Sequence, residues 1–307
     1  MQQATDGRPK RISIADLDET VRSYPSEVRT DKSRLIFTLA VTIISHFFGR
    51  QWVENNIIQD EAHSRPGGFF RMDFSSDYER EKKTFRVVDF AETLFNLQHI
   101  RGFDDRVDQM RSGQVEATYA EFDFARFLYI HDVDFRFVIP SGVKGKDYDF
   151  GITYADGRDA CADAKCRLDM LRHPLDAARS KNLPADQPGI VFIKVPQVWL
   201  DEVSVRRRMD EVVNDFLRGT QRIVSVVVYA TVLVHLPKQE MMWMRHQFRE
   251  ITNPNHRFDQ SKNWALFRDY KVPEEWKGMP PKWVRVFSRG WRPVDDALEG
   301  ATDDGAS

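Results

Sequence analysis

Two short segments with the composition of β-strands, joined by a turn, constrain the fold of this chain most strongly. They occupy residues 147–166 and read DYDFGITY, the turn ADGR, and DACADAKC. Side chains alternate between the two faces of a strand, so Asp163 and Lys165 point the same way and Ala164 points the other way. A hairpin brings Asp149 alongside that pair. The sequence therefore predicts two carboxylates and one ammonium close together.

Length, composition and charge set the class of protein. The chain has 307 residues, of which 41% are hydrophobic and 12% aromatic, enough for a sizeable core in one large domain or two modest ones. The formal net charge of −2 argues against a protein that coats nucleic acid nonspecifically, although a local basic cleft is compatible with it. The spacing of Cys161 and Cys166 fits neither a disulfide framework nor a zinc site, so we expect a reducing compartment.

Nothing in the pattern predicts a membrane segment. The longest apolar runs, residues 35–48 and 223–236, are shorter than the roughly 20 residues that a membrane span needs. The first run predicts a helix, and the second is rich in valine and predicts a buried strand. The first thirty residues lack the pattern of a secretory signal, so we expect a cytoplasmic protein.

The pattern divides the chain into five stretches. They are a flexible N-terminal arm over 1–30, a mainly helical region over 31–112, a core over 113–236, a C-terminal extension packed on the core over 237–295, and a disordered tail over 296–307. The helical region contains predicted helices over Ser33–Phe48 and Asp89–Ile100. In the extension we expect a helix near 238–250, followed by loops that aromatic side chains pack onto the core.

Within the core, the predicted order of elements is α-β-β-β-α-β-α-β. A helix over 115–131 comes first. It is followed by the strand FRFVIP, the two strands of the hairpin and a helix over Asp169–Lys181. The core ends with the strand PGIVFIKVP, an amphipathic helix ending at Gly219 and the long strand RIVSVVVYATVLVHL. An opening run of adjacent strands followed by helical crossovers implies a mixed α/β fold. Its central mixed sheet would be flanked by helices.

The order of elements and the placement of the acids resemble the PD-(D/E)XK nuclease superfamily, whose fold is the restriction-endonuclease-like fold. In that family a helix with a glutamate precedes a strand near an aspartate and a strand bearing Asp or Glu, any residue, and Lys. The resemblance covers residues 113–236, with Asp163-Ala164-Lys165 as the D-x-K motif. This chain departs from the usual pattern in carrying Asp before that lysine and Tyr148, not Pro, before Asp149.

The residues suit metal-assisted hydrolysis. Asp149 and Asp163 would each give an oxygen to Mg²⁺ or Mn²⁺, and the carbonyl of Ala164 could supply another. Such an ion lowers the pKa of a bound water and offsets charge in phosphodiester hydrolysis. Lys165 would orient that water or stabilise the developing charge. The alternative is a plain ion pair between Asp163 and Lys165 on an exposed strand, but the small apolar neighbours favour a central strand.

A glutamate on the preceding helix would complete the site, and two are candidates. Glu121 shares a face with Phe124 and Leu128, which we expect to pack on the sheet, whereas Glu116 lies roughly 140° away around the helix. We therefore favour Glu121.

Basic residues follow the D-x-K strand. Arg167, Arg179 and Lys181 could bind backbone phosphates, or they could form the solvated face of a helix, and the sequence leaves both interpretations open. Lys194, on the next predicted strand, could reach the site or be a simple strand-end charge.

Together these features favour a metal-dependent nuclease that hydrolyses phosphodiester bonds, with DNA preferred over RNA as substrate. The helical region would shape substrate access or form a homodimer. The main alternative is a catalytically inactive nuclease-fold protein acting as a nucleic-acid-binding or protein-interaction module. A second alternative is an α/β domain in which the acids do not converge.

Overall fold

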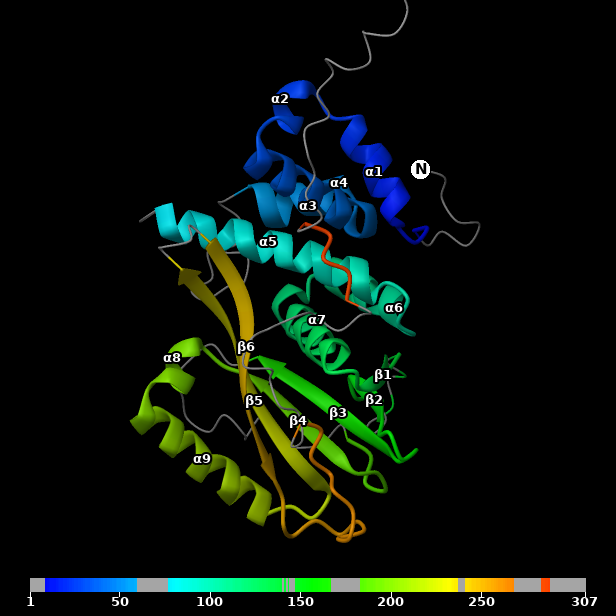
Figure 1. The fold of residues 1–307 in the computed structure, drawn as a ribbon. Helices are drawn as coiled ribbons and strands as arrows, with labels where there is room; N and C mark the ends of the chain where they lie inside the picture. Colours follow the sequence, from blue (N-terminus) through cyan, green and yellow to red (C-terminus); the bar gives the residue numbers. More distant parts are fainter. Residues whose placement is uncertain are drawn as a thin grey trace, which may run out of the picture.

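The computed structural model describes residues 9–59, 77–139, 141, 143, 147–166, 183–236, 241–267 and 283–287. Helices dominate the N-terminal half, and a six-stranded sheet follows in the C-terminal half (Figure 1). The helices before the sheet are α1 (Ile14–Arg22), α2 (Ser26–Arg29), α3 (Lys32–Phe48), α4 (Arg50–Val53), the π-helical turn η1 (Glu54–Ile58), α5 (Asp77–Leu97), α6 (Phe103–Arg111) and α7 (Val115–Ile130). None of the helices in these described ranges is long and apolar enough to cross a membrane.

The start of the chain differs from the flexible arm that the sequence predicted over residues 1–30. From residue 9 onward the structure has α1 and α2 there. Ser13 and Asp16 form a capping box in which each side chain accepts a hydrogen bond from the other residue's backbone N–H. Ile12 and Leu17 are buried in the core. Ile14, Leu17 and Val21 are spaced as one face of a helix, and Ser13 and Asp16 have the spacing of a capping box, so the prediction of an arm overlooked a local helix signal.

The sequence predicted the main helices well. α3 confirms the helix over Ser33–Phe48, and α7 confirms the helix over 115–131 to within a residue. α5 begins at Asp77, twelve residues before the predicted start at Asp89. It ends at Leu97, three residues before the predicted end, where the N–H of Ile100 donates to the carbonyl of Leu97.

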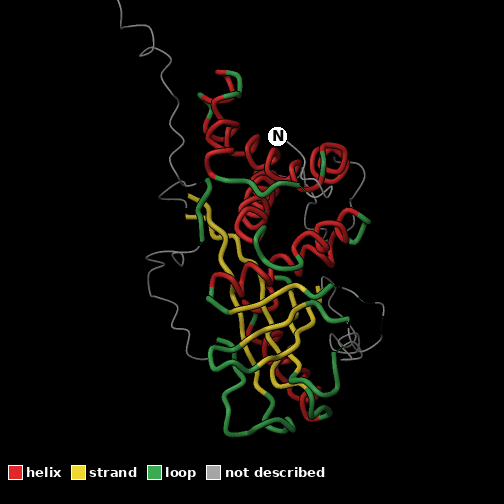
Figure 2. The backbone as a smooth tube through the Cα atoms, turned by 90° about the vertical axis from the view of Figure 1, so that its right-hand side faces the viewer, coloured by secondary structure: helices red, strands yellow, loops and turns green. Residues whose placement is uncertain are grey.

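The six strands form one mixed sheet in sequence order. They are β1 (Asp134–Phe137), β2 (Phe150–Thr153), β3 (Asp159–Cys166), β4 (Gly189–Lys194), β5 (Ile223–Leu236) and β6 (Met241–Thr252). β1, β2 and β3 are antiparallel neighbours, β3, β4 and β5 run parallel, and β6 is antiparallel to β5. The strands cross the lower part of the molecule as one twisted layer (Figure 2). This confirms the predicted mixed sheet flanked by helices.

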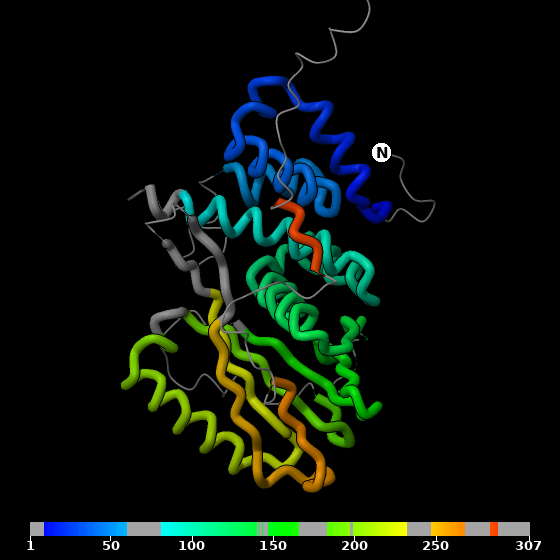
Figure 3. The backbone as a smooth tube through the Cα atoms, in the orientation of Figure 1, coloured from blue at the N-terminus to red at the C-terminus, as the bar shows by residue number. Residues whose placement is uncertain are grey.

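Helices cover both faces of the sheet (Figure 3). α7 packs on one face, where Phe124 contacts the ring of Phe150 on β2. On the other face lie α8 (Gln197–Asp201) and α9 (Val203–Arg218). The second core there includes Val213 of α9 together with Val191 and Val226 of the parallel strands. Because β3, β4 and β5 are covered on both faces, their sequences read as nearly continuous apolar runs.

The helix predicted near 238–250 is wrong, because β6 is a strand over Met241–Thr252. β6 pairs with β5 along its whole length, from Ser225↔Thr252 to Leu236↔Met241. β4 pairs with β5 only as far as Tyr229, so the β5–β6 hairpin extends beyond the rest of the sheet towards α5 (Figure 1). Met, Gln, Arg and Glu are good helix formers, but the long-range pairing with β5 overrides that local preference.

Aromatic side chains attach the C-terminal segments to the core, as predicted. Trp264, Phe267 and Trp283 are buried. The indole N–H of Trp283 donates to the carboxylate of Glu92 on α5, 3.0 Å away. The predicted helix over Asp169–Lys181 and the tail over 296–307 lie outside the described residues.

Candidate active site

The candidate site forms where β3 continues past the end of β2. β2 and β3 pair from Thr153↔Asp159 to Phe150↔Ala162, so none of the described strands lies beside residues 163–166 of β3 on that edge. Asp149, immediately before β2, takes the place of that strand. Its N–H donates to the carbonyl of Ala162, and its Oδ2 accepts a hydrogen bond from the N–H of Ala164, 2.7 Å away. The Asp149 carboxylate is therefore fixed against β3, opposite Asp163.

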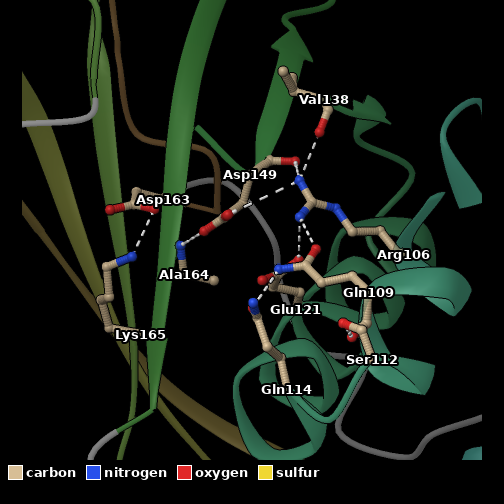
Figure 4. A network of polar contacts seen from close by, with 10 residues as sticks. All are labelled: Arg106, Gln109, Ser112, Gln114, Glu121, Val138, Asp149, Asp163, Ala164 and Lys165. Carbon is tan, nitrogen blue, oxygen red and sulfur yellow. Dashed lines mark hydrogen bonds and ion pairs between the residues drawn. The ribbon is translucent and has the colours of Figure 1, made fainter. Parts of the chain in front are cut away.

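Asp163 and Lys165 share one face of β3, as their spacing predicts. The Nζ of Lys165 lies 2.8 Å from Oδ1 of Asp163. The side chain of Asp163 is 7% exposed and that of Lys165 is 28% exposed, so the lysine is the more accessible of the two. Figure 4 shows Asp149 reaching the backbone of β3 from one side and Lys165 folding back to Asp163.

α6 and α7 supply two further charged side chains. Glu121 is on the second turn of α7, and its side chain is 6% exposed. Nη1 of Arg106, on α6, lies 2.9 Å from Oε2 of Glu121, and Nη2 lies 3.9 Å from Oδ1 of Asp149. Arg106 thus links the helical region to the end of β2 (Figure 4). We refer to Arg106, Glu121, Asp149, Asp163 and Lys165 together as the carboxylate cluster.

Mutual repulsion and burial perturb the acids of the carboxylate cluster. Burial raises the pKa of Asp149 well above its usual value, and the charges of Glu121 and Asp163, with a hydrogen bond between the Asp149 and Asp163 carboxyl groups, raise it further. Burial also raises the pKa of Glu121, although the charges of Arg106 and Lys165 oppose this. Burial is therefore the main reason that both acids resist ionisation.

The pKa of Lys165 is also raised, but burial and the neighbouring charges act on it in opposite directions. Burial lowers the pKa of Lys165, but the charges of Asp149 and Asp163 outweigh this effect, so that the net shift is upward. Lys165 is therefore an ammonium at neutral pH. It is suited to a hydrogen-bond donor or a point charge and unsuited to a general base.

The carboxylate cluster offers oxygen atoms of the kind that hard divalent cations prefer. Oε2 of Glu121 is buried and lacks a hydrogen-bond partner, since its contact with Arg106 is an ion pair without hydrogen-bond geometry. With all five groups ionised, three acids face two cations, which leaves one negative charge in excess. Oxygen ligands of this type suit Mg²⁺ or Mn²⁺. Among the described residues, however, no three His, Cys, Asp or Glu side chains already stand as a ligand set for a metal ion.

The structure brings most of the predicted site residues together. Lys165 pairs with Asp163, and Asp149 accepts from the N–H of Ala164, where the prediction named the carbonyl of that residue. Glu121 pairs with Arg106, and the charges of Glu121 and Asp163 both act on Asp149. Glu116 is half-buried on the first turn of α7, and of the two candidates it is Glu121 whose charge acts on Asp149. The predicted phosphate contacts Arg167, Arg179 and Lys181 lie outside the described residues.

Sequence reasoning missed Arg106, whose side chain is 2% exposed. The signal was present in FDDRVDQM, because Phe103, Val107 and Met110 are all buried and Arg106 lies on the same face of α6. A charged residue on the apolar face of a helix needs a buried partner.

A second buried charge cluster lies beside the first, under α7. Nζ of Lys194 on β4 contacts the carboxylate of Asp123, which also accepts a hydrogen bond from Thr231, 2.8 Å away. Arg126 pairs with Asp89 of α5 at 2.7 Å. Burial raises the pKa of Asp89 to about 7 in spite of that arginine. The sequence left open whether Lys194 reaches the site or is a simple strand-end charge. In the structure it belongs to this second cluster, where it pairs with Asp123.

Comparison of the chain with protein-family models, with curated proteins and with solved structures finds no match.

Proposed function

We propose that this protein is a metal-dependent nuclease with a restriction-endonuclease-like core, hydrolysing phosphodiester bonds in DNA in preference to RNA. One observation carries the proposal: Asp149, Asp163 and Lys165 converge at the open edge of β3, with Glu121 beside them. The helix–hairpin–crossover order around them is the one in which the resemblance expects such a site.

Each residue has a role that follows from its surroundings. Asp149 and Asp163 would hold Mg²⁺ or Mn²⁺, and Glu121 would complete the shell directly or through water. The ion, when bound, lowers the pKa of water and offsets negative charge on the phosphate. The ammonium of Lys165 belongs to a partly exposed side chain and would orient the attacking water or stabilise charge on the phosphate oxygens. The hydrogen bond from Ala164 fixes Oδ2 of Asp149, which limits how that carboxylate can turn.

The test is cleavage of plasmid, single-stranded DNA and RNA in Mg²⁺ or Mn²⁺, with EDTA as the control. We expect Asp163→Asn and Lys165→Ala each to lower the cleavage rate at least ~100-fold, because each removes a group that acts on the reacting phosphate. Matched controls are Asp215→Asn and Lys262→Ala, since both side chains are exposed on the surface. Equal cleavage by site and control variants would refute the proposed site.

A second candidate function is a catalytically inactive module that binds nucleic acid or protein. Arg106 favours it, because the guanidinium already neutralises part of the carboxylate cluster without any metal ion. Under this alternative the protein binds a fluorescent DNA duplex in EDTA, and neither Mg²⁺ nor Mn²⁺ produces cleavage. Fluorescence anisotropy, run beside the cleavage assay, distinguishes the two.

A further inference from the structure

Arg106 is the buried cation around which the carboxylate cluster is built. Its guanidinium donates from Nη2 to the carbonyl of Val138 at 2.7 Å and to the carbonyl of Asp149 at 3.2 Å. Nη1 donates to Oε1 of Gln109 at 2.6 Å and pairs with Oε2 of Glu121. The side chain of Arg106 thereby contacts the backbone on both sides of the loop between β1 and β2, at Val138 and Asp149. It also contacts Glu121 of α7.

These contacts place positive charge where a metal ion would need to act. The guanidinium lies 2.9 Å from the oxygen of Glu121 and 3.9 Å from an oxygen of Asp149, both of which are proposed to face the ion. A divalent cation that approaches these oxygens is repelled by the guanidinium, and little water screens the two charges because Arg106 is 2% exposed.

We propose that Arg106 is a resident counter-ion that sets the divalent-ion affinity of the carboxylate cluster and holds Glu121 away from full coordination; this inference rests on the proposed function. The guanidinium keeps Glu121 and Asp149 in position when no metal ion is bound. It also weakens metal binding, because the ion must share the same two carboxylates with it. Arg106 is thus a positioning residue whose charge, and not its packing alone, matters.

The test compares Mn²⁺ binding to the wild type and to Arg106→Gln by titration calorimetry. We expect Arg106→Gln to bind Mn²⁺ at least about tenfold more tightly, because one nearby positive charge is removed. The matched control is Arg126→Gln, since Arg126 is 3% exposed and pairs with Asp89 at 2.7 Å but lies in the second cluster. Both variants lose a buried ion pair, so both lose stability, and only Arg106→Gln should change the affinity for Mn²⁺.

Arg106→Gln leaves the Glu121 carboxylate buried without a partner and could fail to fold. A second comparison avoids this. Glu121→Gln keeps the guanidinium, and the double variant Arg106→Gln with Glu121→Gln replaces the ion pair by two neutral amides. The double variant should bind Mn²⁺ at least about tenfold more tightly than Glu121→Gln alone, for the same electrostatic reason.

The possible results separate this inference from the proposed function. Tighter binding after removal of the arginine supports the inference, even if the wild type itself binds too weakly to measure. Measurable binding by the wild type with equal or weaker binding after removal overturns the inference and leaves the nuclease proposal standing. Absence of Mn²⁺ binding in the wild type and in every variant overturns both.

Discussion

At the scale of single residues, this protein places several ionisable groups in its interior, and their pairing decides which of them ionise. Glu121 is buried and Asp149 and Asp89 are partly buried, and all three acids have raised pKa values. In each case burial is the largest cause, and a neighbouring cation reduces the shift without cancelling it. The D-x-K spacing was sufficient to predict that Asp163 and Lys165 meet. The pairing of Arg106 with Glu121 was not predictable, because it depends on how two helices pack.

Asp89 provides a test of pH-dependent stability away from the carboxylate cluster. Its pKa rises from 3.8 to about 7 on folding, so the folded state binds more protons than the unfolded state between those values. The free energy of unfolding should therefore fall as the pH rises through this window, by at most ~1.4 kcal/mol per pH unit from this group.

The Asp89→Asn variant isolates that contribution. Denaturant unfolding of the wild type and the variant between pH 4 and pH 8 should show a weaker pH dependence in the variant, because the titrating proton is gone. Acids that do not interact with Asp89 titrate in both proteins and cancel in the difference. Parallel stability curves for the two proteins would mean that Asp89 does not titrate in this range.

At the scale of elements, the sequence predicted those whose pattern is local and missed those that depend on distant partners. α7 and β5 carry clear apolar patterns and were predicted to within a residue or two. β6 is rich in helix-forming residues and becomes a strand only because β5 pairs with it. α1 is an exception, because its signal is local and was still missed: Ile14, Leu17 and Val21 share one face, and Ser13 and Asp16 form a capping box.

The start of α6 offers a test at this scale, because α6 carries Arg106. Gly102, which caps α6, has φ +85°, and a Cβ there would lie 2.5 Å from the carbonyl oxygen of Phe137. Gly102→Ala should lower the free energy of unfolding by about 3 kcal/mol, through left-handed strain and a clash with rigid backbone.

Gly157 provides the matched control, since it has φ +81° but open space where a Cβ would lie. Gly157→Ala should cost only about 1 kcal/mol, from backbone strain alone. Chemical denaturation measures both variants. A cost for Gly102→Ala no larger than that for Gly157→Ala would contradict the close approach of α6 to β1.

At the scale of the whole molecule, a helical N-terminal region and a mixed sheet share one core. The larger apolar cluster runs from Leu39 of α3 through Phe90 of α5 and Phe122 of α7 to Phe150 of β2. The carboxylate cluster lies at this junction, with Arg106 and Glu121 from the helices α6 and α7 and with Asp149 and Asp163 from the sheet. The sequence predicted the sheet and the acids but treated the helical region as separate, because contacts between helices and sheet leave no trace in a single pattern.

The central claim is that Asp149 and Asp163 share one divalent cation at the open edge of β3. Crystals soaked in Mn²⁺ and measured for anomalous scattering test it most directly. We predict a single strong anomalous peak within about 2.0–2.5 Å of oxygens from both carboxylates, the range expected for hard divalent ions. A soaked crystal with no peak between these two side chains, or with Mn²⁺ bound only elsewhere, would contradict the account.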